Sequence, residues 1–119
     1  MTVTNKPPVQ VEITRPAARD LKRLLKKYPH IVEDIEKLIH QLEAGETPGD
    51  RIVGVGRIVF KVRIRSSDLQ KGKSGGYRVI YYLQTAVHTI IITLYPKNER
   101  VDLAPEEIRR MIEEYEQDQ

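Results

Sequence analysis

One stretch, residues 61–97, constrains the fold of this chain more than any other. It opens with cations at every second position, Lys61, Arg63 and Arg65, and this spacing puts all three on one face of a β-strand. A glycine-rich segment with two more lysines follows, and it leads into an apolar strand whose second residue is Arg78. Cations attract an anion and glycines let the backbone approach it closely. The pattern therefore predicts a site that binds phosphate groups.

The positive charge of the chain is concentrated in the same region. The formal net charge is only +3. Residues 51–79, however, hold eight Lys and Arg and a single acid, Asp68, whereas residues 100–119 hold three basic residues and seven acids. Such clustering is typical of proteins that bind a polyanion. A solvated surface is the alternative interpretation, but β-type alternation beside a glycine-rich loop favours a binding site.

Length and composition limit the class of protein. At 119 residues we expect one domain over residues 9–119, preceded by a flexible tail over residues 1–8. The chain has no cysteine, which excludes disulfides and cysteine-ligated zinc. No apolar run reaches membrane-spanning length and the first eight residues are polar, so we expect a cytoplasmic protein with no membrane partner.

Hydrophobic periodicity predicts seven elements of secondary structure. Alternation over residues 9–13 predicts a short strand, and Pro16 opens a helix at its first turn. A stripe of Ile, Val and Leu predicts a second helix over residues 30–44, and the glycines of residues 45–56 indicate a loop. The remaining elements are strands over residues 57–65, 77–84 and 88–95 and a helix that starts at Pro105.

This order, β-α-α-β-β-β-α, indicates an α+β fold. Three consecutive strands form an antiparallel sheet, and we expect the helices to cover one face of it in a two-layer sandwich. The strands over residues 77–84 and 88–95 are apolar on both faces near their centres, which is typical of central strands. On the strand over residues 57–65, the apolar face should pack on the helices and the basic face should point outward.

Arg78 is the most conspicuous candidate for a functional residue. It lies inside a predicted central strand, where an unpaired charge is costly. One interpretation is a structural ion pair with Asp68 or Glu99. The other is a guanidinium group that binds a phosphate through two hydrogen bonds. Lys97 and Glu99 leave the end of the next strand, so they could meet Arg78 at the rim of the sheet.

Other chemistries find little support in the sequence. Gly72-Lys73-Ser74 lacks the first glycine of a P-loop, whose place Ser67 takes, and a strand follows it instead of a helix. The three histidines lack metal-ligand spacing, and neither a Ser-His-Asp arrangement nor a pair of carboxylates accompanies the basic strand. We therefore expect no metal and no small-molecule cofactor. The histidines are His30, His40 and His88.

These residues resemble a known family of proteins. The element order, the basic strand, the run Lys-Ser-Gly-Gly-Tyr-Arg-Val-Ile-Tyr-Tyr at residues 73–82 and the run Leu-Tyr-Pro-Lys-Asn-Glu at residues 94–99 are similar to those of the RelE/ParE toxin superfamily, in its HigB-like RelE branch. The resemblance covers residues 9–116. It implies a toxin of a type II toxin–antitoxin system that cuts messenger RNA on the ribosome and inhibits translation. It also implies a cognate antitoxin protein that blocks the site.

The resemblance assigns roles to individual residues. Arg78 matches the family arginine that holds the scissile phosphate. Arg63 and Arg65 match basic strand positions of the family, and Lys97 matches its strand-end lysine. RNA binding is assigned to Lys61, Arg63, Arg65 and Lys71, and catalysis to Arg78, Lys73, Lys97 and Glu99.

Cleavage by the 2′-hydroxyl of RNA needs a base, an acid and charges that stabilise the phosphorane. Clustered cations supply the charges. Lys73 and Lys97 are candidates for proton transfer, and Glu99 is the one carboxylate that the sequence places near enough to act as a base. RelE proper has a further arginine where this chain has Asn98, and a tyrosine near the start of the last segment, where this chain has residues 101–104. The acid–base scheme of RelE therefore does not transfer intact.

The same superfamily leaves a second function open. Its ParE-like members share the fold but inhibit DNA gyrase without catalysis, and a fold does not by itself determine a function. The basic strand and loop favour RNA cleavage over gyrase inhibition.

Overall fold

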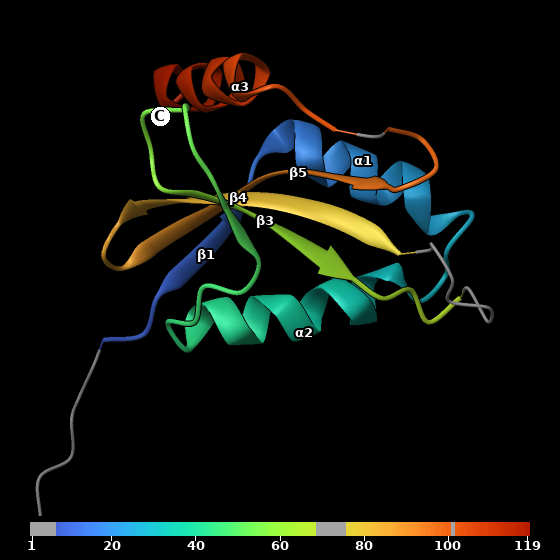
Figure 1. The fold of residues 1–119 in the computed structure, drawn as a ribbon. Helices are drawn as coiled ribbons and strands as arrows, with labels where there is room; N and C mark the ends of the chain where they lie inside the picture. The colour runs from blue at the N-terminus through green and yellow to red at the C-terminus, as the bar shows by residue number, and fades with distance from the viewer. Residues whose placement is uncertain (1–6, 69–75, 101) are drawn as a thin grey trace, which may run out of the picture.

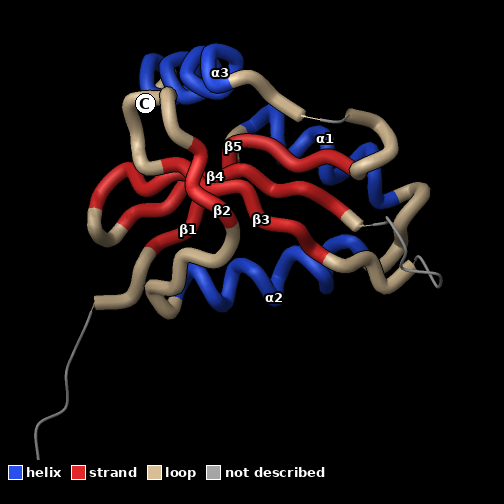
Figure 2. The backbone as a smooth tube through the Cα atoms, viewed as in Figure 1, coloured by secondary structure: helices blue, strands red, loops and turns tan. Residues whose placement is uncertain are grey.

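The strands form one five-stranded sheet in the order β1-β5-β4-β3-β2 (Figure 2). This structure is a computed structural model, and it describes residues 7–68, 76–100 and 102–119. Strand β1 runs parallel to β5, and the other neighbouring strands are antiparallel. The elements are β1 (Gln10–Ile13), α1 (Arg15–Leu25), α2 (Ile31–Glu43), β2 (Asp50–Ile52), β3 (Val59–Ile64), β4 (Tyr77–Thr85), β5 (His88–Pro96) and α3 (Pro105–Gln117).

All seven predicted elements are present, and the α+β class is confirmed. The expectation of a loop over residues 45–56 was wrong in part, because Asp50–Ile52 form β2 and pair with β3. This strand is three residues long and has one apolar residue, Ile52, so it shows no alternation in the sequence. Its conformation is set by pairing with the edge of β3, which local sequence does not report.

Helices α1 and α2 cover one face of the sheet. Thr14 caps α1, because its Oγ1 accepts a hydrogen bond from the backbone N–H of Ala17 at 3.2 Å and donates one to the carbonyl of Ile92 at 3.0 Å. This link ties the start of α1 to β5. The two helices then bury an apolar face against alternate residues of β4 and β5. The buried members of this cluster are Ala17, Leu24, Tyr28, Ile31, Ile35, Leu38, Leu42, Tyr77, Val79, Tyr81, Ile91 and Leu94.

Helix α3 covers the opposite face, so the expectation of helices on one face only was wrong (Figure 1). The reason is that β4 and β5 are apolar on both faces, and both faces must be removed from water. Ile108 and Ile112 of α3 pack with Ile80 and Tyr82 of β4 and with strand β5. The sheet therefore carries a helical hairpin on one side and a single helix on the other. Within the described residues, no helix is long and apolar enough to span a membrane.

The position just before strand β4 requires glycine. Gly76 has a φ of +90°, and a Cβ atom there would lie 2.2 Å from the carbonyl oxygen of Ile64. Only a residue without a side chain allows this close approach of β3 and β4. The contact sets the register in which Ile64 pairs with Tyr77 and Arg63 pairs with Arg78.

Candidate functional site

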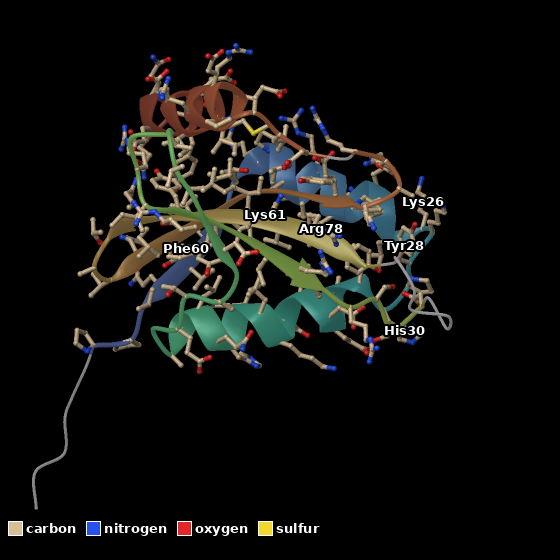
Figure 3. All side chains as sticks on the ribbon, in the orientation of Figure 1. Lys26, Tyr28, His30, Phe60, Lys61 and Arg78 are labelled. Carbon is tan, nitrogen blue, oxygen red and sulfur yellow. The ribbon has the colours of Figure 1, made fainter. Side chains whose placement is uncertain are left out.

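Three side chains form a row across the face of the sheet that α3 covers. Arg78 of β4 lies directly opposite Arg63 of β3 and Tyr95 of β5. Residues opposed in this way on antiparallel strands have Cβ atoms about 5 Å apart. Lys61 lies two residues from Arg63 along β3, on the same face and diagonally across from Arg78 (both are labelled in Figure 3). Sheet pairing thus puts Lys61, Arg63 and Arg78 on one face of the sheet.

Arg78 is buried and forms no ion pair with any of the described residues. Its exposed fraction is 8%, and its Nη1 has no hydrogen-bond partner among the described residues. Burial, and then the neighbouring charge of Arg63, lower its pKa below the usual range of arginine. Neither acid of the ion-pair interpretation meets it: Asp68 binds His30, and Glu99 binds Arg23. The structure thus leaves the guanidinium of Arg78 able to bind an anion.

Tyr95 is a member of the row that the sequence did not single out. It is 4% exposed, and its hydroxyl has no hydrogen-bond partner among the described residues. Burial raises the pKa of this hydroxyl, while the charges of Lys61 and Arg78 act in the opposite direction. The sequence shows only a tyrosine near the end of an apolar run. The sequence could have identified Tyr95 if β4 and β5 were aligned as a hairpin, because this alignment puts Tyr95 opposite Arg78.

Lys61 is half-buried and forms an ion pair at the edge of the row. Its Nζ lies 3.0 Å from Oδ1 of Asp102. The hydrogen bond from Lys61, and then one from the backbone N–H of Leu103, hold the pKa of Asp102 below its usual range. One of the four cations assigned to RNA binding is therefore neutralised by the segment that connects β5 to α3.

Three further predicted residues, Arg65, Lys97 and Glu99, lie at the rim of the sheet. Lys97 is exposed, and its backbone N–H donates to the carbonyl of Gly76 at 3.2 Å, next to the start of β4. Arg65 is exposed just beyond the end of β3. Glu99 is exposed and accepts from Nη2 of Arg23 at 3.1 Å. The predictions for Lys71 and Lys73 fall on residues 69–75, which lie outside the described part of the chain.

The segment before residues 69–75 is fixed to the helical hairpin. The ring Nδ1 of His30 lies 2.6 Å from Oδ1 of Asp68, and the backbone N–H of His30 donates to the same carboxylate at 2.9 Å. The backbone N–H of Ser67 donates to buried Asp34 of α2 at 3.0 Å. These bonds use residues that the sequence did not assign to the site, and they hold the chain in place where it leaves β3.

The arrangement suits binding and stabilisation of negative charge. Two arginines share one face at opposed positions, a tyrosine is opposed to one of them, and a lysine lies two residues from the other on the same face. Guanidinium groups stay charged at all physiological pH values and match the geometry of phosphate oxygens. The row can therefore stabilise negative charge electrostatically. The residues proposed for proton transfer lie outside it.

Comparison with known proteins identifies the fold and the family of this chain. The fold is similar to that of a free-state double mutant of the toxin RelE from E. coli, with a TM-score of 0.52, 17% sequence identity and coverage of 93% of this chain and 97% of that chain. Among proteins with curated functions, none matches the sequence significantly. The sequence profile of one family, described as the RelE toxin of the RelE/RelB toxin–antitoxin system, matches residues 17–116. This chain belongs to the RelE toxin family.

Proposed function

We propose that this RelE-family toxin is a ribosome-dependent endoribonuclease that acts in the cytoplasm, cleaves messenger RNA and so inhibits translation. The observation that carries the proposal is buried Arg78, whose Nη1 has no partner among the described residues and which faces Arg63. A buried cation without a counter-ion costs stability, and an anionic ligand removes that cost. A phosphate of the RNA backbone is a ligand that two opposed guanidinium groups fit.

The reaction follows from the chemistry of RNA. The 2′-oxygen attacks the adjacent phosphorus while its proton passes to a base, and the bond between phosphorus and the 5′-oxygen breaks. That oxygen takes a proton from an acid, which leaves a 2′,3′-cyclic phosphate and a 5′-hydroxyl. Arg78 and Arg63 stabilise the extra charge of the phosphorane. Lys97, at the same end of the sheet, and Lys73 are the candidates for proton transfer.

Dependence on the ribosome is supported by the composition of the row, whose described cations bind RNA but do not orient its 2′-oxygen. Cations bind the RNA backbone without regard to sequence, and this binding does not hold the 2′-oxygen in line with the scissile bond. The ribosome can impose that geometry on the message, and orientation alone is worth several kcal/mol.

A cognate antitoxin is the second partner. We propose that a segment with exposed acids, or an inserted helix, covers the face of Arg63, Arg65 and Arg78, because residues 51–79 carry eight cations and one acid. Complementary charge raises the rate of association, so this rate should fall as salt increases.

Primer extension on messages from translating and translation-blocked extracts tests the proposal. Cleavage only in the translating extract, and its loss in the Arg78→Ala variant, is the expected result. Equal cleavage in both extracts would contradict ribosome dependence. No cleavage in either, together with a loss of DNA supercoiling by gyrase, would support the ParE-like function instead.

A further inference from the structure

We propose that Tyr95 completes the phosphate site, with its hydroxyl donating a hydrogen bond to the phosphate that Arg78 binds through Nη1. This inference rests on the proposed function, because RNA supplies the phosphate, but it concerns binding and not the cleavage step. It makes Tyr95 a residue that holds the substrate.

The register of the sheet places Arg78 and Tyr95 next to each other on neighbouring strands. Arg78 and Tyr95 are directly opposed on β4 and β5, and the irregularities in this strand pair lie further along, beyond Ile80. Arg78 Nη1 and the Tyr95 hydroxyl are the two buried side-chain atoms for which the described residues provide no hydrogen-bond partner. Both atoms belong to opposed residues of one row, so a single anionic ligand could satisfy both. Two unrelated packing defects would not be expected to fall on opposed residues.

The chemistry of the two groups specifies the ligand. A guanidinium has hydrogen-bond donors only, and a tyrosine hydroxyl donates one hydrogen. Because burial raises the pKa of Tyr95, this hydroxyl keeps its proton and remains a donor. The acid near them, Asp102, is already bound to Lys61. A phosphate oxygen, which accepts several hydrogen bonds at once, satisfies both donors.

Access to the row is from the side of Arg63. Arg63 is exposed, Arg78 is 8% exposed and Tyr95 is 4% exposed, so the row becomes more enclosed from β3 to β5. A phosphate would meet Arg63 first and Tyr95 last. Since both unpartnered atoms lie below the surface of the free protein, the Tyr95 contact forms only when neighbouring side chains move aside for the ligand.

The hydroxyl can be tested by a variant that removes it alone. Tyr95→Phe deletes a group that has no partner in the free protein, so the midpoint of thermal unfolding should stay the same or rise. Binding of a fluorescein-labelled oligoribonucleotide with 2′-O-methyl riboses throughout, which the toxin cannot cleave, should weaken roughly tenfold, as expected for a hydrogen bond to a charged group. The dissociation constant is measured by fluorescence anisotropy with the full-length protein.

A double variant tests whether the two groups bind the same phosphate. In the Arg78→Ala background, Tyr95→Phe should weaken RNA binding much less than it does in the wild type, because the two groups bind one phosphate.

Tyr82→Phe is the matched control on the same strand as Arg78. Its hydroxyl donates to Glu116 at 3.0 Å, so its loss should lower the unfolding midpoint and leave oligonucleotide binding unchanged. The inference is overturned if Tyr95→Phe binds like the wild type, or if it behaves like Tyr82→Phe. Cleavage on translating ribosomes separates the two proposals. If Tyr95→Phe weakens RNA binding but the wild type cuts no message, only the proposed endoribonuclease function is contradicted. If Tyr95→Phe binds RNA and cleaves messages like the wild type, only the inference about Tyr95 is contradicted.

Discussion

Arg63 and Arg78 face each other across β3 and β4, so two guanidinium groups occupy opposed positions on one face of the sheet. Like charges opposed in this way destabilise a strand pair. Burial and the charge of Arg63 both lower the pKa of Arg78, and no described residue offers its Nη1 a partner. Perturbed ionisable groups of this kind cluster at functional sites, which is why we place the substrate phosphate here.

Replacing Arg78 by a methionine should separate stability from function. Arg78→Met removes a buried charge and its repulsion with Arg63, so the free energy of unfolding should rise by about 1 kcal/mol. Message cleavage should fall roughly 10²-fold or more, because a stabilising charge is lost from the transition state. Urea unfolding and primer extension measure the two effects. Arg51→Met, at an exposed position of β2, is the control and should change neither quantity appreciably. A destabilised Arg78→Met protein would show that Arg78 is structural.

The ion pair between Glu99 and Arg23 gives a direct test of the role of Glu99. Because Arg23 holds this carboxylate at 3.1 Å, we expect Glu99→Gln to leave the cleavage rate within about twofold of the wild type. Loss of a general base would instead lower it roughly 10²- to 10⁴-fold. Arg23→Gln breaks the same ion pair and is the control. A large loss of cleavage in Glu99→Gln but not in Arg23→Gln would make Glu99 the base.

The sequence predicted the parts of the fold that depend on local pattern. Alternation located β3, proline positions marked the first turns of α1 and α3, and the two-sided apolar character of β4 and β5 identified the central strands. It did not predict β2, which forms only because it pairs with the edge of β3, nor the parallel pairing of β1 with β5. Long-range pairing of short strands leaves no periodic signal.

The sequence likewise identified some residues of the candidate site and missed others. The alternation of Lys61 and Arg63, and the position of Arg78 inside an apolar strand, identified the cations from sequence alone. The position of Tyr95 opposite Arg78 depends on the register between β4 and β5, which the apolar run alone does not show. The ion pair of Lys61 with Asp102 depends on the path of the chain after β5. Both features come from tertiary contacts.

Glycine at position 76 should be essential for folding. An alanine there would take a φ of +90° and place its Cβ 2.2 Å from the carbonyl oxygen of Ile64, so Gly76→Ala should cost roughly 3 kcal/mol or more. Gly45→Ala is the matched control, since Gly45 has a φ of +88° but no atom within 4 Å of the Cβ position. It should cost only about 1 kcal/mol. Urea unfolding distinguishes the two, and equal losses would show that the close approach of β3 and β4 is unimportant.

The contact between His30 and Asp68 should make stability depend on pH. The hydrogen bond and charge of Asp68 raise the pKa of His30, so this part of the stability is complete below the ordinary value of 6.5 and is lost as pH rises through the higher folded pKa. The hydrogen bond with His30 lowers the pKa of Asp68, whose contribution is complete above 3.8 and is lost on acidification. The pair therefore stabilises most between these values.

A histidine substitution measures this effect. The difference in unfolding midpoint between wild type and His30→Asn should be larger near about pH 5.5 than near about pH 9. His40→Asn, at an exposed position of α2 with no carboxylate partner among the described residues, is the control. The interpretation fails if His30→Asn and His40→Asn show the same dependence on pH.

The ion pair between Lys61 and Asp102 should weaken RNA binding in the free toxin. Asp102→Asn removes the carboxylate that holds Lys61 at 3.0 Å, so Lys61 becomes available to a phosphate. Affinity for the 2′-O-methylated oligoribonucleotide should rise about two- to threefold, and the dependence of its binding on salt should steepen because one more phosphate is neutralised. Glu106→Gln, at an exposed position in the first turn of α3, changes the net charge by the same amount and is the control. Fluorescence anisotropy at several salt concentrations measures both variants. An equal gain in the two would mean that total charge, and not the release of Lys61, governs RNA binding.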